Sequence, residues 1–348
     1  TLDERYINYE LFVPASGQTG DKSARNQLIQ DIGEADSTIR VATTYLDDSG
    51  VIDALIAARD RGVRISMVAD ADFQDVEGLE RLEEARITPT YGDGELEYLP
   101  DFFLAQVLAV CQDLEEEKAI VCSSNPSGEQ GTVVRPGDFN SMSDNMFVID
   151  EHVTWNFALP LDGRDVHPIA WRATGNDFSL AYVREIEQMH GGTFATTLDT
   201  FSGPLKSIND MHTEYHTSTG PIEVRFNPQE RLIKEVIDEI YEARASVYVM
   251  SDNIMNPFVL EALEYKHDNG FDVQIVVNDA EQATGSPRQR LEAMDTTFVD
   301  RPDGTVPTVI IIDSEADDHG RTAAVLSHPL VRGAPFEVER PEPVTCQE

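Results

Sequence analysis

The chain has 348 residues, with 26 basic and 64 acidic side chains and a formal net charge of −38. This length allows about two domains of roughly 100 to 200 residues each, and a hydrophobic content of 41% is enough for each to bury a core. No apolar run is long enough to span a membrane, and the first residues lack a signal-peptide pattern. We therefore expect a folded protein with no membrane span and no intact signal peptide.

The negative charge is spread over the whole chain, and only five residues are lysine: Lys22, Lys118, Lys206, Lys234 and Lys266. An acidic, lysine-poor surface stays hydrated and dispersed when salt screens its charges, which is typical of a halophilic protein from a salt-adapted organism. Because no basic stripe interrupts this surface, nucleic acid is not an expected partner.

The chain contains an internal repeat. When the sequence is shifted by 208 positions, residues 29–70 align without a gap on residues 237–278, and eleven of these 42 positions are identical. Random pairing would give about three identities on typical residue frequencies. A repeat of this length predicts two structurally similar lobes.

The first copy of the repeat predicts four elements in order. Apolar residues at helical spacing lead up to Ile32, and a β-rich stretch follows over 38–42. A second helix is predicted over 51–59, with Gly62 suited to its left-handed C-terminal cap, and a strand over 63–69.

The second copy repeats this order. It predicts strands over 246–250 and 271–277, with a helix over 259–267 between them that ends near Gly270. A strand, a helix and a strand at this spacing form a βαβ unit, so each lobe is expected to contain parallel strands.

Further elements are predicted after each copy. In the first half they are strands over 146–150 and 153–159 and a helix over 177–190, and in the second half strands over 308–313 and 321–327.

The spacing of these strands sets the expected domain limits. The strands that end at Asp150 and Asp313 lie 163 residues apart rather than 208, so the first lobe holds about 45 extra residues. We expect lobe one over 1–200 with an insertion over about 93–139, a linker over 201–220, and lobe two over 221–348.

Several short patterns in the first copy also occur in a known family. They are Ala35-x-x-x-Ile-x-Val41, Tyr45, Ala54-Leu55, and Arg-Gly-Val-x-Ile over 61–65. The sequence resembles the phospholipase D superfamily, whose members carry two such α/β copies, and the resemblance covers about residues 24 to 340. It implies an α/β fold of two pseudo-symmetric lobes, each an α-β-α sandwich with a mostly parallel sheet.

The family's active motif is His-x-Lys-x-x-x-x-Asp in each lobe, followed by Gly-Ser-x-Asn. The resemblance implies that one histidine attacks phosphorus, the other acts as a general acid, and both lysines bind phosphate oxygens. In this chain the histidine positions hold Ser143 and Val306, the lysine positions hold Asn145 and Thr308, the aspartates are Asp150 and Asp313, and only Ser327, followed by His328, matches the second motif.

These replacements decide the functional interpretation. Serine and valine have no ring nitrogen for nucleophilic attack, and without the lysines a bound phosphate would keep its charge unbalanced. We therefore expect no catalytic residues and no cofactor, and we interpret the chain as a non-catalytic pseudoenzyme that binds or assembles with another molecule. Asp150 and Asp313 are expected to help orient the lobe interface.

Two alternatives stay open. One is a phosphodiesterase or phospholipase D-type hydrolase with a site rebuilt from Asp150, Asp313, Ser327 and His328. The other is a subunit of a surface or filament assembly. Neither the ligand nor the partner is indicated by the sequence, and both a protein partner and self-association are compatible with it.

The candidate metal ligands do not form a metal motif. His212 and His216 have helical spacing with Glu214 between them, but they lack the order His-Glu-x-x-His. Acidic clusters over 70–77 and 313–318 lack the order of a calcium loop. No metal site is therefore expected.

The three cysteines are Cys111, Cys122 and Cys346. A disulfide between Cys111 and Cys122 would fit an exported protein, whereas three free thiols would fit a reducing compartment. Both states stay open, with an extracellular or cell-surface location slightly favoured.

Overall fold

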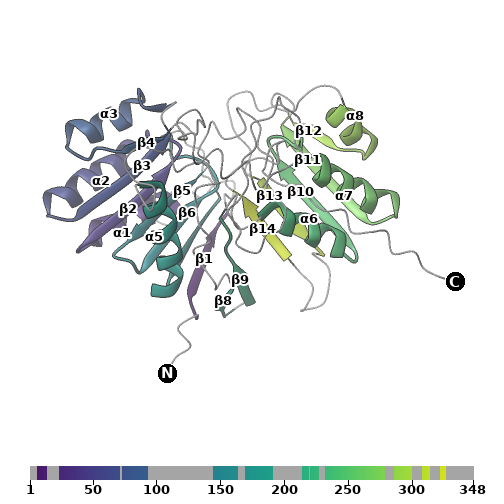
Figure 1. Cartoon of the computed structure of the whole chain (residues 1–348), viewed down its shortest axis with the longest axis horizontal. Helices are drawn as coiled ribbons and strands as arrows, with labels where there is room; N and C mark the ends of the chain where they lie inside the picture. Colours follow the sequence, from purple (N-terminus) through teal and green to yellow (C-terminus); the bar gives the residue numbers. More distant parts are fainter. Residues whose placement is uncertain are drawn as a thin grey trace, which may run out of the picture.

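The computed structural model describes residues 6–13, 23–70, 73–92, 144–163, 169–190, 214–218, 220–226, 232–278, 286–299, 308–313 and 322–326. Its elements form two large β-sheets, each with its own helices, which lie side by side in Figure 1. We call the first sheet with its helices lobe one and the second lobe two.

Lobe one contains a seven-stranded sheet with the order β1-β7-β6-β5-β2-β3-β4. Its strands are β1 (Asn8–Phe12), β2 (Thr38–Thr43), β3 (Arg64–Asp70), β4 (Thr90–Gly92), β5 (Asn145–Ile149), β6 (Val153–Phe157) and β7 (Ala170–Thr174). Its helices are α1 (Ala24–Glu34), α2 (Ser49–Asp60), α3 (Glu77–Glu84) and α5 (Asn176–His190).

Lobe two contains a five-stranded sheet with the order β12-β11-β10-β13-β14. Its strands are β10 (Ser246–Ser251), β11 (Asp272–Asn278), β12 (Thr297–Val299), β13 (Thr308–Ile312) and β14 (Thr322–Leu326). Its helices are α6 (Leu232–Glu242), α7 (Pro257–Asp268) and α8 (Ser286–Ala293).

The two sheets share one pairing register. Thr38 of β2 pairs with Arg64 of β3, and Ser246 of β10 pairs with Asp272 of β11, so both pairs keep the shift of 208. Val41 and Val249 accordingly lie on equivalent strands, β2 and β10, each with a parallel neighbour on one side and an antiparallel neighbour on the other. This agreement is what the predicted repeat requires of the fold.

The α/β class and the two similar lobes are confirmed, but parallel pairing is confined to the repeated units. Strands β2, β3 and β4 are parallel, as are β10, β11 and β12. The remaining strands, β5, β6, β7 and β1 in lobe one and β13 and β14 in lobe two, join antiparallel. The expectation of mostly parallel sheets is corrected to mixed sheets, because strands joined by short turns, as β5 and β6 are, pair antiparallel.

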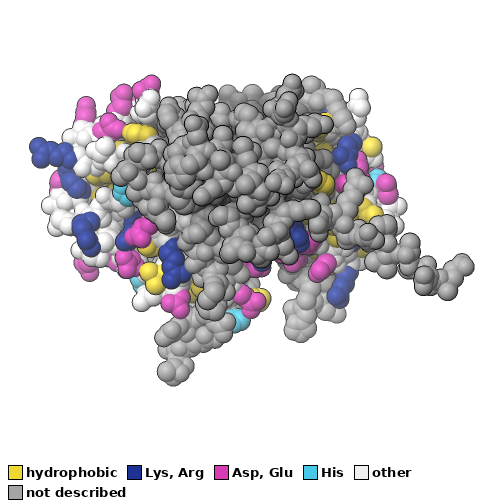
Figure 2. Space-filling view, viewed as in Figure 1, with side chains coloured by type: hydrophobic (Ala, Val, Ile, Leu, Met, Phe, Trp, Pro, Cys, Tyr) yellow, Lys and Arg dark blue, Asp and Glu magenta, His cyan; other side chains and the backbone are white. Residues whose placement is uncertain are grey.

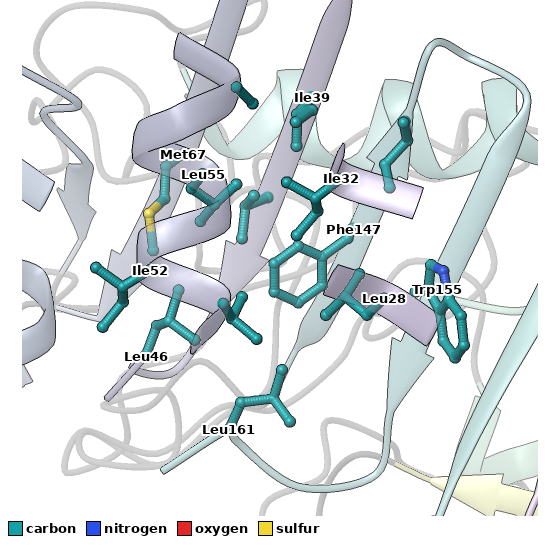
Figure 3. Packing of buried hydrophobic residues seen from close by; sticks show 14 of the residues in the cluster. Leu28, Ile32, Ile39, Leu46, Ile52, Leu55, Met67, Phe147, Trp155 and Leu161 are labelled. Atoms are coloured by element: carbon teal, nitrogen blue, oxygen red, sulfur yellow. The ribbon is translucent and has the colours of Figure 1, made fainter. Parts of the chain in front are cut away.

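Helices cover both faces of the sheet in lobe one. On one face, α1, α2 and α3 pack on β2, β3, β5 and β6, and Figure 3 shows Leu28, Ile32 and Leu55 meeting Phe147 and Ile39 there. On the other face, Phe178 and the other apolar residues of α5 pack on Ala42, Val68, Met146 and Val148 of the sheet. Successive side chains of a strand point to opposite faces, so each strand supplies both cores.

The described core of lobe two lies on one face of its sheet. Apolar residues of α6, α7 and α8 pack there on Val247, Val249, Ile275, Ile310 and their neighbours. Helices on both faces are thus observed in lobe one, whereas each helix described in lobe two packs on the same face.

Helices α2 and α7 of the repeated units are capped at both ends. Asp48 caps α2 by accepting hydrogen bonds from the backbone N–H groups of Gly50 and Val51, and Asn256 caps α7 in the same way. Beyond the two C-termini, Gly62 and Gly270 have φ angles of +97° and +80°, the left-handed conformation predicted for them.

A short hairpin lies within and after the predicted linker. Strands β8 (Glu214–Thr217) and β9 (Gly220–Glu223) pair antiparallel, and Tyr215 is buried with α5 in lobe one. The described end of the stretch 201–220 is therefore packed against lobe one. The domain limits themselves stay predictions.

The insertion over 93–139, with Cys111 and Cys122, lies outside the described residues, as does Cys346. Within the described part of the chain, no helix is both long and apolar enough to cross a membrane.

Candidate functional site

Half of the predicted site residues belong to the described chain. Asn145, Asp150, Thr308 and Asp313 are described, whereas Ser143, Val306, Ser327 and His328 lie outside the described residues. The site can therefore be built from the two lysine positions and the two aspartate positions.

Asn145 and Thr308 occupy equivalent places in the two lobes. Asn145 begins β5 opposite Thr43, the last residue of β2, and Thr308 begins β13 beside Ser251, the last residue of β10. Both therefore lie at the carboxyl ends of the parallel strands, where α/β sheets usually bind ligands. Their side chains are buried, with exposed fractions of 1% for Asn145 and 2% for Thr308.

In lobe one, Asn145 is hydrogen-bonded to the end of β2. Its Oδ1 lies 3.1 Å from the Thr43 hydroxyl and accepts from the backbone N–H of Thr44 at 3.4 Å. The Thr43 hydroxyl also lies 2.8 Å from the backbone carbonyl of Tyr45. Since a hydroxyl has one hydrogen, it donates to one of these two oxygens at a time.

In lobe two, Thr308 is held by the equivalent contact. Its hydroxyl lies 2.9 Å from the hydroxyl of Ser251, which donates to the backbone carbonyl of Asn253 at 3.0 Å. Thr43 and Ser251 are related by the shift of 208, and both bond to the carbonyl two residues later. Each lobe therefore fills its lysine position with a buried, neutral side chain bonded to its own backbone segment.

Buried acidic groups lie near the same strand ends. Asp70 ends β3 and is 1% exposed, and the equivalent residue of β11 is Asn278, also 1% exposed. Asn278 donates through Nδ2 to the Asp252 carboxylate at 3.1 Å. Buried carboxylates repel a phosphate anion, so these groups cannot take the role that the resemblance implies for lysines at this end of the sheet.

Asp150 lies at the opposite end of the lobe one sheet. It follows β5, which is five residues long, and this places it about 16 Å from Asn145 at the strand rise per residue. Its carboxylate accepts hydrogen bonds from the backbone N–H groups of Asp36, Ser37 and Thr38 at 2.8 Å each. Asp150 thus fixes the turn between α1 and β2.

Asp313 does the same in lobe two. It accepts from the backbone N–H groups of Arg244, Ala245 and Ser246, at distances of 2.6 to 3.1 Å. The expectation that both aspartates orient the lobe interface is therefore corrected. Each closes a turn within its own lobe, because the strand after the helix begins beside the end of β5 or β13.

The turn contacts also set the charge state of these aspartates. Burial raises the pKa of Asp313, but the three backbone hydrogen bonds and the nearby Lys266 ammonium outweigh it and hold the pKa below its ordinary value. The pKa of Asp150 is likewise lowered, because the hydrogen bonds from residues 36–38 outweigh burial. Both groups are therefore carboxylates at neutral pH.

Two cationic side chains lie at the turns that Asp150 and Asp313 close, and no role for them was predicted from the sequence. Lys266 is 3% exposed and donates to the backbone carbonyl of Ala243 at 2.6 Å. In lobe one Arg61 donates to the carbonyls of Ile32 and Ala35 at 2.9 and 3.4 Å. Each cation stabilises the last carbonyls of a helix. The Arg-Gly-Val pattern contains Arg61, but no sequence signal marks Lys266.

The candidate metal ligands are not brought together in the described chain. His216 lies in β8, while His212 is outside the described residues. No group of three or more His, Cys, Asp or Glu side chains that could hold a metal ion occurs among the residues described.

Comparison with known proteins adds a match to a domain model over part of the chain and a likeness of fold. Residues 28–155 match the family model described as "Cardiolipin synthase, PLD-like domain". No curated protein matches the sequence. The polyphosphate kinase from Porphyromonas gingivalis is similar in structure, with 12% identity, a TM-score of 0.52, and coverage of 93% of this chain and 46% of that one. This chain therefore spans less than half of the kinase, and the likeness shows the fold alone.

Weaker structural likenesses carry no argument of their own. Nuc from Salmonella typhimurium, a phospholipase D family member, has 12% identity and a TM-score of 0.31 over 52% of this chain and 92% of its own. Phosphatidylserine synthase from Haemophilus influenzae Rd KW20 has 12% identity and a TM-score of 0.46 over 88% of this chain and 76% of its own.

Proposed function

We propose that the chain, whose residues 28–155 match the PLD-like domain model, is a non-catalytic phospholipase D-like protein that binds or assembles with another molecule. One observation carries the proposal: both lysine positions of the family motif hold buried, neutral side chains, Asn145 and Thr308, in equivalent hydrogen-bonded settings.

The chemistry of phosphoryl transfer supports this interpretation. The reaction needs a nucleophile and cations that stabilise the charge on phosphate in the transition state. Ser143 and Val306 stand at the histidine positions, and neither side chain can form a phosphohistidine. The amide of Asn145 and the hydroxyl of Thr308 carry no charge to offset that of a phosphate.

The geometry argues against a rebuilt hydrolase that uses Asp150 and Asp313. Each carboxylate accepts hydrogen bonds from three consecutive backbone N–H groups, so its lone pairs already have partners. The distance of about 16 Å along β5 also separates Asp150 from the strand end that carries Asn145. The assembly-subunit alternative differs from the main proposal in the size of the complex and is compatible with this geometry.

Purified protein in molar potassium chloride is expected not to hydrolyse bis-p-nitrophenyl phosphate or phosphatidylcholine above background. The missing cations and nucleophile give the physical reason, and release of p-nitrophenolate or choline is the measurement.

Two variants, at residues that lie outside the described part of the chain, show where any observed turnover comes from. Turnover that is abolished by Ser327→Ala or His328→Ala would contradict the proposal and support the rebuilt hydrolase. Turnover that both variants retain at the unaltered level would point to a contaminating enzyme.

We further propose that the protein works in high salt. Figure 2 shows acidic side chains on the described surface of both lobes, and the net charge is −38. Raising potassium chloride from 0.1 M to 1 M shortens the Debye length from about 10 Å to about 3 Å, which weakens self-repulsion in the folded state. We expect the midpoint of thermal unfolding to rise strongly over this range.

The salt test depends on the choice of ion. Potassium chloride is preferred to sulfate, because sulfate stabilises folded proteins by exclusion from their surface whatever their charge. An unfolding midpoint that stays constant between the two chloride concentrations would remove the argument for salt adaptation.

A further inference from the structure

One face of the lobe two sheet presents apolar side chains away from the described helices. Val247, Val249, Ile310 and Ile312 point toward α6, α7 and α8. The residues that alternate with them on the strands must point to the opposite side. We call this side the open face, and it carries Tyr248, Met250, Val276, Val309 and Ile311.

The apolar residues of the equivalent face of lobe one are covered by α5. Its residues Ala42, Val68, Met146 and Val148, which match Met250, Val276, Val309 and Ile311 in register, are each 0% exposed beneath α5. On the open face, Ile311 is 37% exposed and Met250, Val276 and Val309 are partly exposed. None of the helices that the structure describes packs on this face.

The contrast is one of burial rather than of side-chain type. Met250 and Ile311 are larger than Ala42 and Val148, so lobe two offers at least as much apolar surface as the covered face. An exposed apolar surface on a folded protein commonly marks a binding site. Lobe one also shows what fits such a face, since a single amphipathic helix lies across it.

The charge at the rim indicates which kind of helix would bind. In lobe one, Arg40 of the sheet forms an ion pair with Glu187 of α5 at 3.0 Å. The residue equivalent to Arg40 is Tyr248, whose hydroxyl donates to the Asp272 carboxylate at 2.6 Å. The positive charge that meets Glu187 in lobe one is thus replaced by a negative one in lobe two.

We propose that the open face binds an amphipathic helix of a partner protein, placed as α5 is placed on lobe one, with a lysine or arginine at the position of Glu187. A second copy of this chain is a poorer occupant for two reasons. Two copies that each carry a net charge of −38 repel one another, and the apolar face of α5 is already buried in its own lobe one. The inference rests on the proposed function only in taking the chain to be a binding protein.

The test uses two fluorescein-labelled peptides with the sequence of residues 176–190. One carries the change Glu187→Lys and the other keeps the glutamate. In the lowest salt that keeps the protein folded, anisotropy should show the lysine peptide binding at least about threefold more tightly, from one added surface charge pair. Equal binding of both peptides, or no binding of the lysine peptide, would overturn the proposal.

Protein variants place the peptide on the open face. Ile311→Glu should weaken binding at least tenfold, because it introduces an unpaired carboxylate into an apolar contact. Ile311→Thr, which keeps a β-branched residue in the strand, should weaken it less. The matched control is Val13→Glu, which changes an exposed apolar residue of lobe one, and it should bind as the unaltered protein does. Peptide binding that survives Ile311→Glu in a folded variant would overturn the assignment.

Analytical sedimentation tests whether a second copy of the chain, rather than a partner helix, occupies the open face. A dimer that Ile311→Glu converts to a monomer would show that a second copy covers the open face, and it would overturn the partner helix. The peptide assay is independent of hydrolysis. Phosphodiester turnover with normal peptide binding would defeat the proposed function alone, and loss of peptide binding without turnover would defeat this inference alone.

Discussion

Replacing Asp313 with alanine is expected to lower the free energy of unfolding of lobe two by about 3 to 5 kcal/mol, as the loss of one partner of a buried charged network commonly does. The carboxylate is 3% exposed and accepts from three consecutive backbone N–H groups. Its removal leaves these donors unpaired and takes away a negative charge that interacts favourably with buried Lys266.

Urea unfolding in molar potassium chloride measures this effect. The matched control is Asp268→Ala, since the Asp268 side chain is 78% exposed and, within the described part of the chain, forms an ion pair with neighbouring His267. This control should change stability by about 0.5 kcal/mol or less. If Asp313→Ala were no more destabilising than Asp268→Ala, the turn contacts would have no energetic importance.

The effect of Asp313→Ala should also depend on pH. Because the pKa of Asp313 is lower in the folded state than its ordinary value of 3.8, the carboxylate stabilises the folded protein fully above that value. Its contribution is lost as the pH falls through the folded-state pKa. The difference between the unaltered protein and the variant should therefore be constant near neutrality and shrink below pH 3.8.

Asp31→Ala is expected to lower the free energy of unfolding of lobe one by about 3 kcal/mol, since it breaks a buried ion pair on one side. Asp31 accepts from the indole Nε1 of Trp155 at 2.7 Å and from Arg172 Nε at 2.7 Å. Trp155 is 0% exposed, so its N–H would lose its partner in a dry site. The Arg172 charge would also lose its carboxylate.

Tryptophan fluorescence during urea unfolding reports this change, because Trp155 lies in the core that Asp31 joins. Asp53→Ala is the matched control, since Asp53 also pairs with an arginine, Arg81, but its side chain is 67% exposed. Surface ion pairs contribute about 0 to 1 kcal/mol, so the control should be close to neutral. If both variants lowered the free energy of unfolding equally, burial of the Asp31 ion pair would not increase its contribution to stability.

The two ends of each sheet differ in how they compare with the phospholipase D motif that the sequence resembles. At the end of each sheet where a helix turns into its strand, Asp150 and Asp313 match the motif and accept hydrogen bonds from backbone N–H groups. These contacts stabilise the fold and need no part in catalysis. At the opposite end, the cationic positions hold Asn145 and Thr308, which bond within their own lobes. Structural aspartates without the reactive groups of the motif are what the proposed binding role would lead us to expect.

The sequence by itself determined the order of elements within the repeated units and the equivalence of their strands. These depend on local patterns, such as alternating apolar residues in β2 and β10 and the cap residues Gly62 and Gly270 after the helices. Equal spacing in the two copies then leaves one register that buries the apolar face of both sheets.

Only the tertiary structure decided which distant residues meet. Asp31 and Trp155 are 124 residues apart and Asp150 and Ser37 are 113 apart, and neither pair has a sequence signal. The antiparallel additions to each sheet and the different cover of the two equivalent faces were not predicted either. Burial and the pairing of buried polar groups depend on contacts between segments far apart in the chain, and local sequence patterns carry no information about those contacts.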